Sequence, residues 1–111
     1  MDIIRHIPRA AVFGLKDEVE CLPGQIVSKT IAQNEAVSLT LFAFDTDEEI
    51  GTHESSGDAL VCVLSGTGEI TIADEKFVLH AGQSILMPAR TPHAVRALEP
   101  FKMALTVVFA I

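Results

Sequence analysis

The sequence predicts an all-β protein, a sandwich or barrel of short strands in a single domain. Short apolar runs rich in β-branched residues recur along the chain, and turn signals separate them at a spacing typical of such folds. No stretch carries a sustained helical period, and only residues 15–19 are compatible with one helical turn. With 111 residues, the chain has the commonest size of one domain and can bury its own core.

Almost everything after the first 24 residues reads as strands and turns. Alternation is clear in residues 36–44, where Val37, Leu39 and Leu41 share one face of the strand. The segment 65–68 is a turn whose two glycines can take positive φ angles. The expected strands are, in order, residues 25–32, 36–44, 60–64, 69–73, 76–79, 84–87, 93–98 and 101–111, with an acidic loop at 45–49.

The first 24 residues differ from the rest. They contain Pro8, Gly14, Pro23 and Gly24, so we expect an irregular N-terminal segment (residues 1–24) that packs on a barrel formed by residues 25–111. No linker, internal repeat or low-complexity segment divides the chain.

Two of the expected strands, residues 59–64 and 101–111, are apolar on both faces. A strand with one face in water would alternate apolar and polar residues, so these strands need a second cover. The N-terminal segment can supply part of that cover. We expect a second subunit to supply the remainder, and we therefore predict a homodimer.

Composition excludes several classes of partner. The net charge is −7 and no basic cluster occurs, so we expect no nucleic acid partner and no binding to an anionic membrane. No apolar run has the length of a transmembrane helix, and the first residues lack the pattern of a signal peptide. We expect a cytoplasmic protein. Cys21 and Cys62 form no disulfide framework, and Cys62 is expected to pack as a small apolar residue outside any pocket.

Two stretches each place one histidine beside a turn-rich segment and an apolar strand. The first runs from Gly51 to Gly66 and contains His53; the second runs from Gly82 to His93. Together they resemble the two signature motifs of the cupin family, small β-barrels that hold a metal or a small molecule inside. The resemblance covers about residues 37–98 and implies a cupin-like double-stranded β-helix, the jelly-roll barrel.

The first cupin motif, G-x5-H-x-H-x3-4-E-x6-G, uses even spacings to point two histidines and a glutamate into the barrel. On this chain the first histidine is His53 and the closing glycine is Gly66, but the second histidine is replaced by Ser55 and the glutamate by Ala59.

The second cupin motif, G-x5-7-P-x-G-x2-H-x3-N, keeps its glycine, proline and histidine as Gly82, Pro88 and His93. Its internal glycine is replaced by Arg90 and its asparagine by Ala97.

The resemblance implies that two of four family metal ligands remain, His53 and His93. Imidazoles bind divalent Fe, Mn, Ni or Zn, but a firm site needs three or more protein ligands. Asp58 could be a third if a bulge at Ser56-Gly57 corrected its strand parity. Glu54 has the parity of a residue that faces outward.

We expect a pocket lined by five residues: His53, Ser55, Asp58, Arg90 and His93. The Ser55 hydroxyl could bond a ligand, and Arg90 could bind a carboxylate or phosphate, unless it is only a solvated loop residue. The alternative, which we consider the weaker one, is that the histidines are two strand-end residues of a former site, satisfied by water.

Three functions agree with this pattern. The first is a small-molecule-binding barrel, with a divalent metal held by His53 and His93. The second is a metal-dependent enzyme, an oxygenase or isomerase, in which Asp58 moves a proton. The third is a structural or regulatory dimer with a vestigial pocket. Fold alone does not choose among them.

Overall fold

The structure is a computed structural model that describes residues 2–110. The all-β prediction is confirmed, and the expected single helical turn is present as a short 3-10 helix. The elements, in chain order, are η1 (Leu15–Glu18), β1 (Ile26–Gln33), β2 (Val37–Phe44), β3 (Glu49–His53), β4 (Asp58–Ser65), β5 (Thr67–Ile72), β6 (Glu75–His80), β7 (Ser84–Met87), β8 (His93–Ala97) and β9 (Phe101–Val108). Strand β3 was not expected, because the acidic residues before it indicate a loop.

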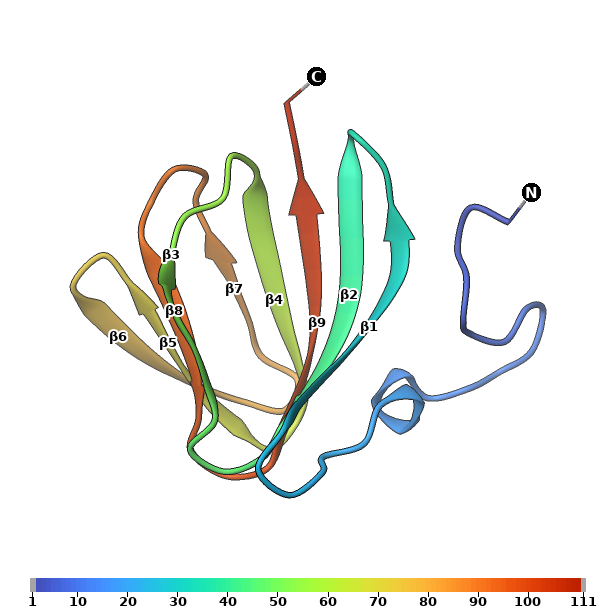
Figure 1. Cartoon of the computed structure of the whole chain (residues 1–111), viewed down its shortest axis with the longest axis horizontal. Helices are drawn as coiled ribbons and strands as arrows, with labels where there is room; N and C mark the ends of the chain where they lie inside the picture. Colours follow the sequence, from blue (N-terminus) through green and yellow to red (C-terminus); the bar gives the residue numbers. More distant parts are fainter. Residues whose placement is uncertain (1, 111) are drawn as a thin grey trace.

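The strands form two antiparallel sheets that face each other. One sheet has five strands in the order β1-β2-β9-β4-β7, and the other has four in the order β3-β8-β5-β6. Figure 1 shows that the sheets converge at one end of the barrel and diverge at the other, where the β3–β4 and β7–β8 loops lie. Neighbours such as β2 and β9 are far apart in sequence, which is the jelly-roll arrangement that the motifs predict.

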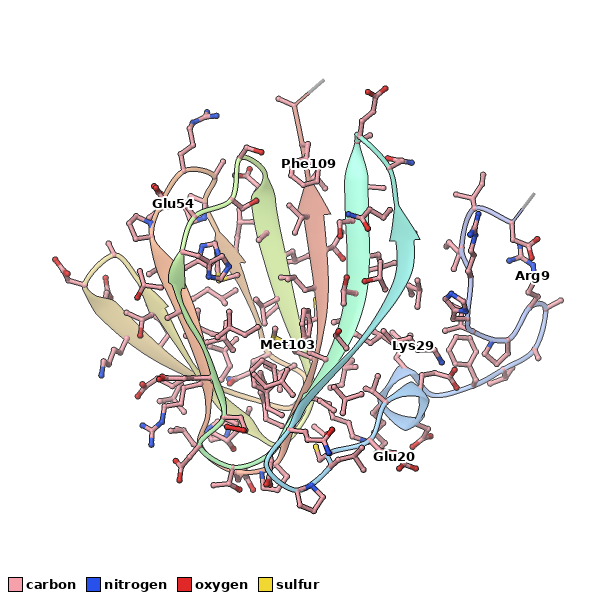
Figure 2. The ribbon with its side chains drawn as sticks, in the orientation of Figure 1. Arg9, Glu20, Lys29, Glu54, Met103 and Phe109 are labelled. Atoms are coloured by element: carbon pink, nitrogen blue, oxygen red, sulfur yellow. The ribbon has the colours of Figure 1, made fainter. Side chains whose placement is uncertain are left out.

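Apolar side chains fill the space between the sheets at the converging end. Phe44 and Phe101 are fully buried there, with ring centroids 5.3 Å apart. Gly68 lies against the second ring, since a Cβ at this position would stand 2.6 Å from Phe101. Met103, two residues after Phe101 on β9, also lies between the sheets (Figure 2). This close packing closes the converging end of the barrel.

A second, smaller apolar cluster lies on the outer face of the five-stranded sheet. Val19 from the N-terminal segment packs there with Leu41 and Ala104, and Cys62 lies at the edge of the cluster, outside the barrel as expected. A half-buried ion pair between Lys29 and Glu18 (3.2 Å) holds η1 against β1. The second half of the N-terminal segment therefore covers one part of this face.

The first half of the N-terminal segment makes fewer contacts with the barrel than the second half. Residues 2–14 lie beyond the edge strand β1 (Figure 1), and almost all of their side chains are exposed. The arm, as we call residues 2–14, touches β1 through a hydrogen bond of 2.7 Å from the Arg5 backbone N–H to the Ile31 carbonyl. The arm therefore contacts the barrel mainly along β1.

Candidate functional site

The structure brings the two motif histidines together at the open end of the barrel. His53 ends β3 and His93 begins β8, and the two residues are directly opposite across the β3–β8 pair. Their Nε2 atoms are 3.1 Å apart, and the rings meet edge to face with centroids 4.3 Å apart. His93 is only 3% exposed, whereas His53 is open to solvent. The site therefore has one buried and one accessible imidazole.

An irregularity in β3 turns His53 inward. Ile50 pairs with Val95 and His53 pairs with His93, so three steps along β3 match two steps along β8. An extra residue in one strand reverses the alternation of the side chains that follow it. As a result, Ile50 and His53 both line the interior, although their odd spacing would place them on opposite faces of a regular strand.

Backbone carbonyls determine which ring nitrogens carry hydrogen. His53 Nδ1 lies 2.8 Å from the Gly51 carbonyl oxygen, and His93 Nδ1 lies 3.2 Å from that of Thr91. A carbonyl oxygen only accepts hydrogen bonds, so each Nδ1 is the donor. With both Nδ1 atoms donating, each neutral ring leaves its Nε2 as an acceptor, so the 3.1 Å contact between the two Nε2 atoms needs a proton or another cation between them.

The surroundings of His93 oppose its protonation. Burial is the main cause of a lowered pKa, and the neighbouring His53 acts in the same direction, while the Thr91 carbonyl and Glu54 act against them. The neutral form of His93 is thus favoured near neutral pH. In that form the pair is a ready acceptor for a cation placed between the two rings.

Two hydrogen bonds join the loops that carry the motifs. The backbone N–H of Arg90 donates to the Ser55 carbonyl at 2.7 Å, and that of Ala89 donates to the Asp58 carboxylate at 2.8 Å. The β7–β8 loop, which leads into His93, is therefore anchored to the loop that follows His53. Ser55 lines the interior, and its hydroxyl oxygen accepts the Gly57 N–H.

Two of the expected pocket residues do not line the interior. Asp58 keeps outward parity, because β4 pairs regularly with β9 from Asp58 to Val63 and no bulge reverses it. Its carboxylate instead accepts a hydrogen bond from the Ala89 N–H. Arg90 has an exposed side chain, and its backbone adopts a φ of 57°, the left-handed conformation that suits the glycine of the family motif.

A cavity of about 320 Å³ opens beside the histidine pair. Its polar lining comes from His53, Glu54, Ser55 and His93, and its apolar lining is larger. The apolar residues are Phe42, Ile50, Ala59, Met87, Val95, Met103, Leu105 and Val107. The interior therefore combines a polar end with apolar walls.

Glu54 is the site residue that the sequence pattern misses. It lies at the open end of the barrel (Figure 2) and lines the cavity, although strand parity predicts an outward side chain. Strand β3 ends at His53, so alternation no longer governs the next residue. The only sequence signal for Glu54 was its position next to the histidine.

Asp58 does not join the two histidines as a third metal ligand. Within residues 2–110, no group of three or more histidine, cysteine, aspartate or glutamate side chains is arranged to hold a metal ion.

The same residues contain no helix with the length and apolar character needed to cross a membrane.

Comparison with known proteins agrees with this architecture. The cupin domain family matches residues 40–109. A conserved protein of unknown function from Streptococcus pyogenes is 43% identical, with all of this chain and 97% of that chain covered and a TM-score of 0.97. A cupin superfamily protein from Desulfitobacterium hafniense is 28% identical, with 96% and 98% of the two chains covered and a TM-score of 0.92.

A cupin 2 conserved barrel domain protein from Leptotrichia buccalis is 38% identical over 86% of this chain and 47% of that longer chain, with a TM-score of 0.84. We found no match to the sequence among curated proteins. The family match spans more than half of the chain and includes strands β3 to β9 and both motif histidines. This chain therefore belongs to the cupin family.

Proposed function

We propose that this cupin binds a small molecule in its barrel, next to a divalent transition metal ion (Fe, Mn, Ni or Zn) held by His53 and His93. The observation that carries the proposal is the pair of facing Nε2 atoms, 3.1 Å apart. Nitrogens bound at about 2.1 Å to adjacent positions of one metal ion are about 3 Å apart. The spacing and the lone pairs both suit a shared cation.

The residues around the pair fit a metal site with two protein ligands. The Gly51 and Thr91 carbonyls hold both rings in the tautomer that leaves Nε2 free, the usual role of outer partners of metal-bound histidines. Two protein ligands retain a metal less firmly than three or four. The remaining positions are open to water or to the bound molecule. A bound metal would supply Lewis-acid chemistry to an oxygen of that molecule.

The cavity indicates the kind of molecule that fits. Its volume of about 320 Å³ is at the lower end of the range for small-molecule sites. Its walls are mainly apolar, while the polar groups gather near His53, Glu54 and Ser55. We therefore propose a small, largely apolar ligand with one oxygen-bearing polar end that lies against the histidine pair.

Glu54 supports a second candidate, a metal-dependent enzyme of the oxygenase or isomerase type. Such an enzyme needs a group that moves a proton beside the substrate. Asp58 is unsuitable, since it lies outside the cavity and accepts a hydrogen bond from Ala89. Glu54 lines the cavity and affects the pKa of His93, so it would take that role.

Metal analysis tests the proposal. Protein purified without a histidine tag is titrated with Mn²⁺, Fe²⁺, Ni²⁺ and Zn²⁺ while bound metal and Tm are measured. We expect at least one ion to bind and raise the Tm of the wild type but not of the His53→Ala/His93→Ala variant. His80→Ala is the matched control, because His80 pairs with Thr67 at the opposite end of the four-stranded sheet.

The same titration, repeated with small carboxylate, alcohol and ketone probes of largely apolar character, tests ligand binding. If no metal ion and no small molecule stabilises the wild type, and the double variant is as stable as the wild type, the pocket is vestigial and the proposal is wrong. Turnover of a bound probe that Glu54→Gln abolishes would favour the enzyme.

A further inference from the structure

The loop that follows His53 crosses the open end of the barrel. Strand β3 belongs to the four-stranded sheet and β4 to the five-stranded sheet, so residues 54–57, which we call the mouth loop, pass from one sheet to the other. Figure 1 shows this loop at the end where the sheets diverge. Glu54 and Ser55 line the cavity. The position of the mouth loop therefore affects the opening of the cavity.

The mouth loop ends at Gly57, a buried residue that packs against the end of β9. A Cβ at Gly57 would stand 2.6 Å from the Val108 carbonyl oxygen. It would also stand 2.9 Å from side-chain atoms of Val107 and Phe109. A backbone can approach its neighbours this closely only at a glycine. The ring of Phe109 thus occupies space that a side chain at Gly57 would need.

Phe109 continues the inward face of β9. The pairing of β9 with β2 reaches Val108, and the Phe109 N–H donates to the Ala36 carbonyl at 2.9 Å, so the ladder extends by one residue. Side chains alternate along a strand, and Leu105 and Val107 line the cavity. Phe109 therefore lies on the same face, and Figure 2 shows it at the open end. Its half-buried ring lies at the rim of the cavity.

We propose that Phe109 is the positioning residue of the mouth loop and limits the access of small molecules to the histidine pair. Its ring holds the loop at Gly57. The Ser55 carbonyl, in the same loop, accepts the Arg90 N–H at 2.7 Å, so the β7–β8 loop is held as well. His93 follows this second loop and is 3% exposed. This role goes beyond the proposed function, because it requires neither a metal ion nor a ligand.

The contact between Phe109 and Gly57 resists local opening of the mouth loop. When the loop moves away from β9, the covered part of the ring is exposed to water, which costs free energy. An alanine at position 109 removes most of this cost, so the loop should open more often. Leucine keeps much of the apolar contact and should keep the loop closed.

The test is the rate at which diethyl pyrocarbonate, a small reagent that acylates neutral imidazoles, modifies each histidine of the full-length protein. Peptide mass spectrometry gives the initial rates. We expect Phe109→Ala to accelerate the modification of His93 about tenfold and Phe109→Leu to change it little. The exposed His80 is the internal reference, and its rate should be the same in all variants. Phe13→Ala is the matched control, because Phe13 is 37% exposed but lies on the arm.

A destabilised variant separates control of the opening from general loosening. Gly68→Ala strains the packing around Phe101 at the converging end of the barrel, and it should leave the His93 rate unchanged. An unchanged His93 rate in Phe109→Ala would overturn the proposal. An equal acceleration in Gly68→Ala or in Phe13→Ala would overturn it too.

Amide hydrogen exchange followed by NMR provides a second readout. The Arg90 N–H should exchange faster in Phe109→Ala than in the wild type, because its acceptor lies in the mouth loop. The Ala97 N–H, which donates to the Glu48 carbonyl at 3.0 Å, should exchange as in the wild type. Equal Arg90 exchange in the two proteins would contradict the positioning role. None of these measurements uses a metal ion or a ligand, so failure of the proposed function would leave their outcome unaffected.

Discussion

Arg90 donates its backbone N–H to the carbonyl oxygen of Ser55, and this 2.7 Å bond joins the two halves of the site. The first residue lies in the loop that leads to His93, and the second lies just after His53. Arg90 makes the bond from a left-handed backbone with φ at 57°. The position of the histidine pair therefore depends on a backbone conformation that costs an L-residue energy.

Arg90→Gly should stabilise the protein. Glycine removes the steric cost of the left-handed conformation, while its larger entropy loss on folding offsets part of the gain, so we expect a net gain of about 0.5–1 kcal/mol in the free energy of unfolding. Urea denaturation measures it. Arg90→Ala, which removes the guanidinium but keeps the strained backbone, should be close to neutral. A stabilised alanine variant would show that the side chain, and not the backbone, is the source of the cost.

Asp58→Ala should loosen the β7–β8 loop. The Ala89 N–H then loses its acceptor at 2.8 Å, which should lower the free energy of unfolding by about 1 kcal/mol. Asp58→Asn keeps an oxygen in the same place and should lose less. Thermal unfolding at one protein concentration provides the measurement, and equal losses in both variants would argue against the hydrogen bond as the cause.

Gly68→Ala should be strongly destabilising. The added methyl group would stand 2.6 Å from the ring of Phe101, which is fully buried and has no room to move. Such overpacking costs about 1–3 kcal/mol. Gly51→Ala is the control, because a Cβ there meets no atom within 4 Å. Chemical denaturation measures the free energy of unfolding of both variants, which should be clearly lower for Gly68→Ala. Similar values would show that the packing around Phe101 can adjust to the added methyl group.

The metal-free protein should lose stability as the pH falls below about 6.5. The pKa of His93 is lowered by burial and by His53 from the ordinary value of 6.5, so below that value the unfolded chain binds a proton at this position more readily than the folded chain. The free energy of unfolding is then unaffected above pH 6.5 and decreases as the pH drops toward and through the lowered pKa.

The measurement for this pH dependence is Tm from pH 7.5 to 5.0 in the presence of a chelator. His93→Gln should flatten the decline, because glutamine does not titrate. The negative charge of Glu54 acts against the lowered pKa of His93 and should reduce the decline. A Tm that rises on acidification, or an undiminished decline in His93→Gln, would contradict the assignment to His93.

The fold was predictable because its signals are local. Glycine-containing turns and alternating residues mark nearly every strand, and the convergence of His53 and His93 follows from the two motifs. Strand β3 was missed, since its sequence, Glu49-Ile-Gly-Thr-His53, begins with the last residue of an acidic run and has a glycine at its centre.

Side-chain direction around the site was less predictable. The irregularity in β3 places Ile50 and His53 on the same face of the strand. Counting residues along the sequence cannot reveal such an irregularity. Asp58 points outward because side chains alternate regularly along β4. Glu54 lines the cavity because β3 ends at His53, so strand alternation does not set the direction of the next side chain. The position of the arm beside β1 depends on tertiary contacts that no local pattern encodes.

Because Phe44 and Phe101 close one end of the barrel, a molecule can reach the cavity only through the open end. A ligand of the kind proposed above would enter with its apolar portion first and leave by the same path, past Glu54 and the accessible His53. Its polar terminus is then the only point from which a tether could reach bulk water. Candidate compounds coupled to a resin through that terminus should still be captured, whereas those coupled through the opposite terminus should be rejected.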